Sequence, residues 1–347
     1  MPHSSIQSQV LSAGGGMWVR PTRWTLSRLA AVYGRAIARR NRQFDNGTRK
    51  IVRLAVPVIS VGNITTGGTG KTPLAIELCK LLAGRGRTPA VVARGYKSRR
   101  GEPADELTTV SERVPEAVCV ANPDRAAGGR AAIERGADVI VLDDGFQHRR
   151  VARDLDIVLV DATDPLRSGH LLPLGRLREP VEQLARADLI VISRADLAGD
   201  GEIARLQELV ARMAPKAHCV TCRHRPVGVL DLCGSSCTSH YERAFLFGGI
   251  GNPEAFVRTV KGMGIDPVGW RWWPDHHRYT HRDLLKLAES ALAVEHDVVL
   301  TTEKDAVKLR GVDVPGLGPL RVVAIDIEFL DGGEQVVASC LDAVLTS

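Results

Sequence analysis

Short runs of Val, Ile and Leu, each separated from the next by a stretch with helical spacing, constrain the fold of this chain most. Runs this short and this continuously apolar are typical of parallel strands that are buried on both faces of a sheet. The alternation of strand and helix patterns therefore predicts an α/β fold with a parallel sheet at its centre. The runs expected to form this first sheet are 56–63, 88–96, 137–145, 155–162 and 187–196.

A glycine-rich turn follows the first of these runs and precedes a helical segment from about 73 to 83. A phosphate-binding loop needs glycines so that backbone N–H groups can converge on phosphate oxygens. It also needs a lysine that reaches the β- and γ-phosphates and a hydroxyl that ligates Mg²⁺. The strict pattern has a glycine where Thr65 stands, so the match is a variant P-loop. The loop residues are Thr65, Thr66, Gly67, Gly68, Thr69, Gly70, Lys71 and Thr72.

Two adjacent carboxylates, Asp143 and Asp144, close the third apolar run. An acidic residue at the end of a buried strand is where P-loop enzymes hold Mg²⁺ or its bound water. Asp143 and Asp144 are therefore predicted metal ligands together with Thr72, and a helix N-cap is the structural alternative.

Three further segments carry chemistry-bearing residues, and each has more than one interpretation. The basic segment 94–100 could receive a phosphorylated acceptor or could be a solvated loop. Segment 193–196 loosely resembles the guanine-reading element of GTPases, but it lacks the Asn and Lys, so a strand end with a helix cap is favoured. Segment 272–279 places Asp and His side by side, as a metal site, a general base or a structural loop would.

The seven cysteines are odd in number and scattered, which argues against a disulfide framework and favours a reducing compartment. Two pairs with His neighbours have spacing that a zinc site could use, but the first pair, Cys219 and Cys222, lies in or beside an apparent strand. Free cysteines are therefore the favoured interpretation. The pairs are Cys219 with Cys222, and Cys233 with Cys237.

The net charge of +6 is concentrated at the N-terminus, because residues 1–60 hold ten Lys and Arg residues and one acidic residue, Asp45. This uneven distribution disfavours a nucleic-acid binder, whose basic surface would recur along the fold. From Pro21 the spacing predicts a basic amphipathic helix with aromatic residues. Such a helix is typical of an interfacial membrane segment, and a surface helix docked on its own domain is the alternative.

These patterns predict four parts of the chain. Residues 1–16 read as a disordered leader, with no signal sequence and with Met17 as an alternative start, and 17–50 as the basic helix region. Residues 51–222 are expected to form a P-loop kinase-type parallel-sheet domain, and 223–347 a second, smaller α/β domain.

In this order the motifs resemble the tetraacyldisaccharide 4'-kinase (lipid A 4'-kinase) family of Gram-negative outer-membrane biosynthesis. The likeness runs from about Met17 to Leu309 and is most specific in VGNITTGGTGKTP, RGYKSR, VLDDGFQHRR, GRLREP, PDHHRYT and TTEKDAVK. The resemblance implies a P-loop kinase-type domain, a smaller C-terminal α/β domain, and an N-terminal helix that contacts membrane and lipid.

The resemblance also implies roles for individual residues. Lys71 and Thr72 would bind the phosphates of ATP and Mg²⁺, and Lys71 would take part in catalysis. The family's catalytic Asp sits in a Gly-Asp-Glu segment, which Ala104-Asp105-Glu106 matches with Ala in place of Gly. Asp105 would be that catalytic Asp, His276 its partner, and Glu179 an acidic residue near the nucleotide.

The expected activity is ATP-dependent phosphorylation of the 4'-hydroxyl of a tetraacyl disaccharide 1-phosphate, an acylated lipid held at a membrane. The expected location is the cytoplasmic face of the inner membrane, as a peripheral protein, and the oligomeric state stays open. A GTPase-type switch that delivers metal or other cargo is the alternative, motivated by 193–196 and the cysteines.

Overall fold

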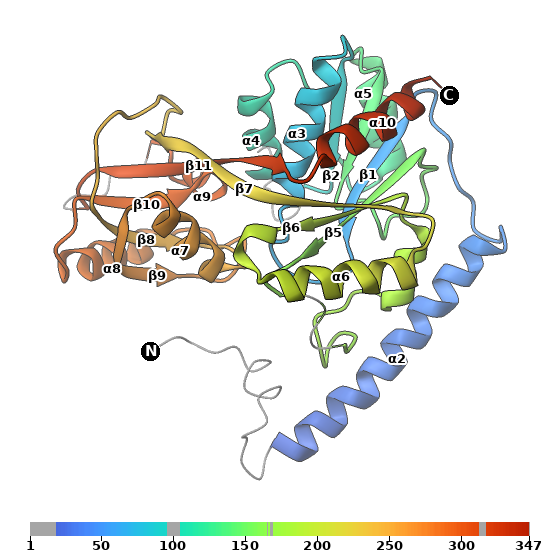
Figure 1. The fold of residues 1–347 in the computed structure, drawn as a ribbon, viewed down its shortest axis with the longest axis horizontal. Helices are drawn as coiled ribbons and strands as arrows, with labels where there is room; N and C mark the ends of the chain where they lie inside the picture. Colours follow the sequence, from blue (N-terminus) through green and yellow to red (C-terminus); the bar gives the residue numbers. More distant parts are fainter. Residues whose placement is uncertain (1–18, 96–104, 165, 167–168, 312–316, 347) are drawn as a thin grey trace.

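All strands of the computed structural model belong to one 11-stranded sheet, with the order β3-β2-β4-β1-β5-β6-β7-β11-β10-β8-β9 (Figure 1). The structure describes residues 19–95, 105–164, 166, 169–311 and 317–346. The strands are β1 (Val58–Asn63), β2 (Pro89–Ala93), β3 (Val118–Ala121), β4 (Val139–Asp143), β5 (Leu155–Asp161), β6 (Leu189–Ser193), β7 (His218–Leu230), β8 (Arg243–Gly248), β9 (Asp266–Trp272), β10 (Val298–Thr302) and β11 (Leu320–Phe329).

One half of the sheet is parallel and consists, in spatial order, of β3, β2, β4, β1, β5 and β6. It is covered on both faces, as the continuous apolar sequences of its strands predict. Side chains alternate between the faces, so Ile59 and Val61 pack under α3 while Val58 packs on the opposite side. The helices of this half are α3 (Lys71–Ala83), α4 (Asp105–Arg113), α5 (Arg125–Glu134) and α6 (Asp200–Met213). The predicted α/β fold with a mostly parallel sheet is confirmed.

The long strand β7 joins this half to the rest of the sheet. Its first residues pair in parallel with β6, and from Cys222 onward it pairs antiparallel with β11. The predicted domain boundary between residues 222 and 223 therefore falls inside one continuous strand. We keep the division into two parts as a proposal, with the two-stranded ribbon of β7 and β11 as the connection.

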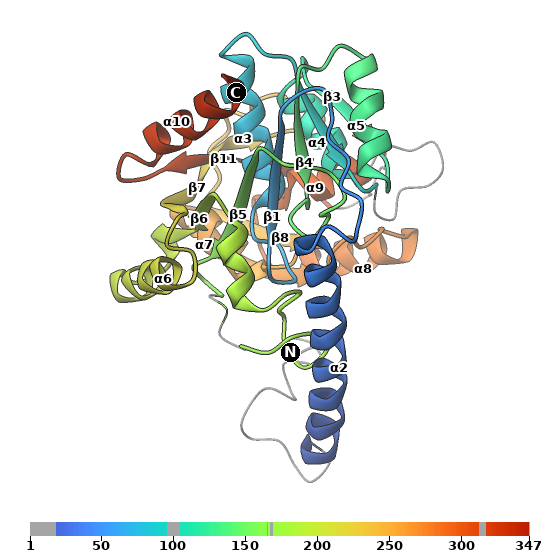
Figure 2. The ribbon, with the colours of Figure 1, turned by 90° about the vertical axis from the view of Figure 1, so that its right-hand side faces the viewer.

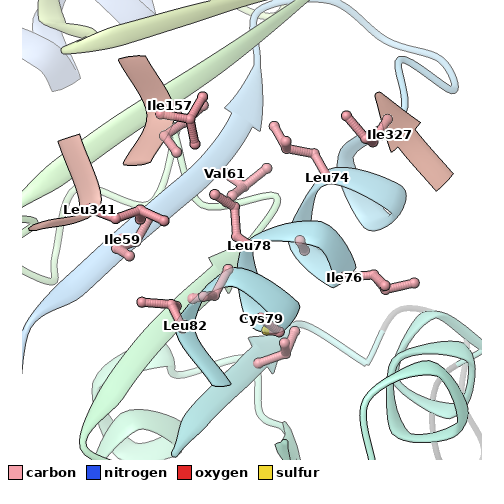
Figure 3. Packing of buried hydrophobic residues seen from close by; sticks show 14 of the residues in the cluster. Ile59, Val61, Leu74, Ile76, Leu78, Cys79, Leu82, Ile157, Ile327 and Leu341 are labelled. Carbon is pink, nitrogen blue, oxygen red and sulfur yellow. The ribbon is translucent and has the colours of Figure 1, made fainter. Parts of the chain in front are cut away.

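The C-terminal part places β10, β8 and β9 beside β11, with α7 (Pro253–Gly262), α8 (His281–Leu292) and the short α9 (Glu303–Ala306) around them. The last helix, α10 (Gly333–Leu345), returns to the first half of the sheet (Figure 1). Leu341 of α10 is fully buried in the same cluster as Ile59 and Leu78 (Figure 3). The core of the first half thus depends on residues near the end of the chain.

The helix expected from Pro21 is α2 (Val19–Asp45), and it projects from the body of the molecule (Figure 2). Its C-terminal turns are docked, because the Tyr33 hydroxyl donates to the Arg178 carbonyl at 2.9 Å and Arg40 pairs with the buried Glu179 at 2.7 Å. Trp24 and Val32, nearer its N-terminus, are about three-fifths exposed, at 63% and 61%. Among the described residues no helix is both long and apolar enough to cross a membrane.

Two strands and three α-helices of the structure had no counterpart in the sequence prediction: β3, β9, α4, α6 and α10. β3 has only four residues, and Pro267, Gly269 and charged residues interrupt the apolar pattern of β9. The Asp-His-His segment that follows β9 does lie in a loop. The predicted leader at 1–16 and most of the basic segment 94–100 lie outside the described residues.

Replacing Leu341 by Ala should lower the free energy of unfolding by about 2–5 kcal/mol, because the change leaves a cavity between α10 and β1. Leu292→Ala is the matched control, since Leu292 is 68% exposed and its loss should cost less than about 0.5 kcal/mol. Urea unfolding of both variants measures the difference. Equal midpoints would show that α10 does not belong to the core.

Candidate active site

The P-loop connects the end of β1 to the start of α3, and its backbone takes conformations that favour glycine. Gly67 has φ 119° and Gly70 has φ 96°, both in the left-handed region that a side chain would strain. Two arginines bind the loop carbonyls, with Arg176 donating to the Thr66 oxygen at 2.9 Å and Arg194 to the Gly68 oxygen at 2.8 Å. These two arginine hydrogen bonds stabilise the conformation of the loop.

The acidic pair lies beside the P-loop because β4 is the parallel neighbour of β1, with Asp143 in register with Val61. The Thr72 hydroxyl donates to Asp143 Oδ2 at 3.3 Å, and the Lys71 ammonium lies 3.5 Å from Asp144 Oδ1. Arg178 contacts both oxygens of Asp144, at 2.9 and 2.8 Å. The structure therefore brings together the loop, the lysine, the hydroxyl and both carboxylates that the sequence singled out.

The pKa values of the two carboxyl groups are shifted in opposite directions. Burial, and next the Glu106 carboxylate, raise the pKa of Asp143 to about 6. Burial also acts on Asp144, but Lys71 and Arg178 outweigh it and lower the pKa of that carboxyl. Asp144 is thus held as an anion by two cations. Among the described hydrogen bonds and ion pairs no cation contacts the Asp143 carboxylate, and Arg125 donates to the Asp143 backbone carbonyl at 3.1 Å.

The residues around Asp143 fit a magnesium ion. Its Oδ1 is buried and has no hydrogen-bond partner among the described residues, and Thr72 offers a hydroxyl oxygen next to its Oδ2. The described residues hold no cluster of three or more His, Cys, Asp or Glu side chains that could bind a metal ion by themselves. Mg²⁺ in phosphate sites needs only one or two carboxylates, because substrate phosphates and water complete its shell.

A loop of the C-terminal part packs directly on the P-loop. Gly251 lies so close to Gly68 that a Cβ at 251 would overlap the Gly68 backbone nitrogen. Its neighbour Asn252 donates to Asp161 at 3.3 Å, and Asp161 also pairs with Arg194. A small polar hollow remains between the loops, lined by Thr65, Thr66, Gly67, Gly68, Thr69, Asp161, Asp164, Arg176, Gly251 and Asn252.

A second charged cluster joins α4 to the C-terminal part. His276, with φ 59°, lies with its Nδ1 3.4 Å from Glu106 Oε1 and its Nε2 3.2 Å from the Lys304 ammonium. Burial and then Lys304 lower the pKa of His276. Asp105 Oδ2 lies 3.6 Å from the ammonium of Lys308, which is itself only 7% exposed. The acidic start of α4 and the Asp-His-His loop, 170 residues apart in sequence, therefore share one site.

Two of the predicted site residues have contacts other than those expected. The carboxylate that contacts the His276 ring at Nδ1 is Glu106, while Asp105 forms an ion pair with Lys308. Glu179 is fully buried, and its oxygens accept from Arg40, Asn41 and Arg186. These contacts tie Glu179 to α2, so its described hydrogen bonds anchor the N-terminal helix and do not involve the P-loop.

Sequence reasoning assigned no role to Arg176, Arg178 and Arg194, which bind the P-loop or Asp144. The first two lie in GRLREP and the third in segment 193–196, where the favoured interpretation was a strand end with a helix cap. Strand β6 does end at Ser193, and a short 3₁₀ helix, η2 (Ala195–Leu197), follows Arg194. In addition, Ser193 and Arg194 donate to the carbonyls of Thr69 and Gly68. The available signal was their position directly after strands or within a motif at the carboxyl edge of the sheet.

In this parallel sheet a glycine-rich loop with a lysine and a hydroxyl follows one strand, and an acidic pair follows the neighbouring strand. This arrangement defines a P-loop kinase-type protein. A family model described as tetraacyldisaccharide-1-P 4'-kinase matches residues 22–346. The chain belongs to the tetraacyldisaccharide 4'-kinase family, which confirms the resemblance seen in its motifs. Membership makes it a kinase that transfers phosphate to an alcohol group, and it disfavours the GTPase-type switch.

Relatives match over nearly their whole length. The tetraacyldisaccharide 4'-kinase of Anaeromyxobacter sp. (strain K) is 39% identical, over 91% of this chain and 89% of the relative. That of Chlorobaculum parvum is 35% identical, over 94% and 96%. The crystal structure of the "apo" form of LpxK from Aquifex aeolicus in complex with ATP superposes with a TM-score of 0.71 at 26% identity, over 93% of this chain and 99% of that one.

Lys71→Met should reduce phosphoryl transfer from ATP by roughly 100-fold or more, because it removes a cation from the site of charge development. The fold should persist, since the Lys71 ion pair described here is one 3.5 Å contact with the partly exposed Asp144. Lys50→Met, at an exposed position, controls for loss of a positive charge. Turnover of the Lys71 variant close to that of the control would remove the P-loop lysine from the mechanism.

Proposed function

We propose that this chain transfers the γ-phosphoryl group of ATP to the 4'-hydroxyl of a tetraacyl disaccharide 1-phosphate, which gives a bisphosphorylated lipid A precursor. The observation that carries the proposal is the convergence of Lys71, Thr72, Asp143 and Asp144 at the carboxyl ends of β1 and β4. Family membership supplies the acceptor, because the relatives are named for that reaction.

In this proposal Lys71 binds the β- and γ-phosphates, and the backbone N–H groups of the P-loop position them. Thr72 and Asp143 would hold Mg²⁺, with Asp144 close by. Mg²⁺, when bound, neutralises charge on the phosphates. Positioning and charge neutralisation supply most of the catalysis that phosphoryl transfer requires.

The acceptor hydroxyl is a poor nucleophile, so a base must take its proton. We assign this step to the carboxylates at the start of α4, with His276 as their partner. Asp105 is the residue that matches the family's catalytic position, and Glu106 is the one in contact with the His276 ring. Both lie on the first turn of α4, and Glu106 is close enough to Asp143 to raise its pKa.

The decisive experiment for the reaction is a transfer assay with [γ-³²P]ATP, Mg²⁺ and a tetraacyl disaccharide 1-phosphate in detergent micelles. A bisphosphorylated lipid should form with ATP and not with GTP. Absence of labelled lipid with an intact, ATP-binding protein would contradict the proposed acceptor. Hydrolysis of GTP alone would support the switch instead.

We also propose that α2 holds the protein on the cytoplasmic face of the inner membrane, where the acylated acceptor is embedded. One face of α2 combines Trp24 and Val32 with the exposed Arg28, Arg35 and Arg39. Apolar and cationic side chains on one helix face suit the interface of an anionic bilayer. The opposite side is docked through Tyr33 and Arg40, so the basic face remains available.

A kinetic cycle should identify the acid–base pair. Asp105→Asn, Glu106→Gln and His276→Gln should each lower kcat with little change in the KM for ATP, because none is expected to hold the nucleotide. Each carboxylate variant is then combined with His276→Gln. For the carboxylate that works as one unit with His276, the kcat of the double variant should be scarcely lower than that of the poorer single variant. Multiplicative losses with both carboxylates would exclude such a pair.

Replacing Arg28, Arg35 and Arg39 together by Gln should weaken binding to phosphatidylglycerol vesicles by roughly 100-fold, at about 1 kcal/mol for each residue near the surface. A matched triple replacement of exposed arginines on the body of the protein should have a much smaller effect. That control is Arg130, Arg205 and Arg212 to Gln. Equal losses in co-sedimentation would show that α2 is no membrane contact.

A further inference from the structure

Lys304 lies in the TTEKDAVK motif, to which the resemblance assigned no role. It follows β10 on the first turn of α9, and the Thr302 side chain caps that turn by accepting from the Asp305 backbone N–H at 3.3 Å. The Lys304 ammonium donates to Asp275 Oδ1 at 2.8 Å and lies 3.2 Å from His276 Nε2. The ammonium also lies 4.0 Å from Glu106 Oε1, so Lys304 is close both to the His276 ring and to the carboxylate that contacts this ring.

The chemistry of the donors fixes the state of the ring. An ammonium group has three donors and no acceptor, so it can bind His276 Nε2 only through the lone pair of that nitrogen. The single proton of the neutral imidazole must then be on Nδ1. Nδ1 lies 3.4 Å from Glu106 Oε1, so this proton is on the side of the ring that faces the acidic start of α4.

The charges around the ring agree with a neutral imidazole. Asp105 and Glu106 face it from α4, Asp275 from its own loop, Lys304 from α9 and Lys308 from the 3₁₀ turn η3 (Val307–Leu309). Burial is the largest cause of the lowered pKa of His276, and Lys304 is the next. Lys304 also acts to lower the pKa of Glu106, which burial raises.

We propose that Lys304 is a positioning residue that holds His276 as the neutral tautomer with its proton on Nδ1, directed at the carboxylates of α4. The proposal rests on the proposed function for its catalytic meaning. With Nε2 bound by an ammonium, the imidazole donates to the carboxylate and does not itself take the acceptor's proton there. The proton of the sugar hydroxyl passes to the carboxylate as the oxygen–phosphorus bond forms and ADP leaves.

The tautomer is measured by ¹⁵N NMR of the full chain labelled at histidine, with the His276 signals assigned from their loss in His276→Gln. In the wild type, Nδ1 should carry the proton and Nε2 should not at neutral pH. In Lys304→Met the ring should become a mixture of tautomers and its pKa should rise. Lys304→Arg, which keeps the donor and the charge, should restore the wild-type pattern.

Kinetics supply the second readout. Lys304→Met should lower kcat by roughly 100-fold, the lower end of what a positioned proton-transfer group contributes, with the KM for ATP within about twofold. The acid limb of the pH profile should move to higher pH, because loss of the ammonium raises the pKa of both Glu106 and His276. Lys261→Met, at an exposed position of α7, is the matched control and should change neither.

The outcomes separate this inference from the proposed function. A wild-type ring with its proton on Nε2, or a Lys304→Met ring with unchanged tautomer and titration, would overturn the role of Lys304 while leaving the kinase activity untouched. A wild type that shows the expected tautomer but labels no lipid would overturn the proposed acceptor alone. A fall in kcat that Lys304→Arg does not rescue, with unchanged NMR, would mean a structural contact only.

Discussion

The parallel pairing of β1 with β4 is the interaction on which the rest of the site depends. Its register sets Asp143 beside Val61, two residues before β1 ends and the P-loop begins. Adjacent parallel strands end at the same edge, so loop and carboxylate meet without any long connection. Thr72 and Lys71 then reach Asp143 and Asp144 from the first turn of α3.

Because of the antiparallel ribbon of β7 and β11, residues of the C-terminal part lie next to the phosphate site. The ribbon continues the sheet into the C-terminal part, which places Gly251 against Gly68 and the Asp-His-His loop against α4. Charged contacts across this junction reinforce it, with Arg113 of α4 paired to Glu303 at 2.6 Å and Lys80 of α3 to Asp326 at 2.6 Å. The helices that carry the phosphate loop and the acidic turn are thus fixed to the part that supplies His276.

The segment around Glu179 connects the N-terminal helix to the phosphate site. Glu179, which was expected near the nucleotide, is fully buried, and its carboxyl oxygens accept from Arg40, Asn41 and Arg186. An unpaired buried carboxylate would be costly, so removal of Arg40 would disturb the docking of α2 as well as the charge balance around Glu179. Its neighbour Arg178 binds Asp144, so the anchor of the helix and the phosphate site share one short segment.

Local patterns in the sequence determined the parallel sheet, the P-loop and the acidic pair, because strand periodicity, glycine-rich turns and strand-end carboxylates are encoded within a few residues. The short β3, the edge strand β9 and the return of α10 were decided by packing, for which no local pattern exists. Tertiary packing also decided the contact of Arg194 with the Gly68 carbonyl and that of Lys304 with His276. A long side chain can reach several partners, and only the tertiary structure decides which one lies within hydrogen-bonding distance.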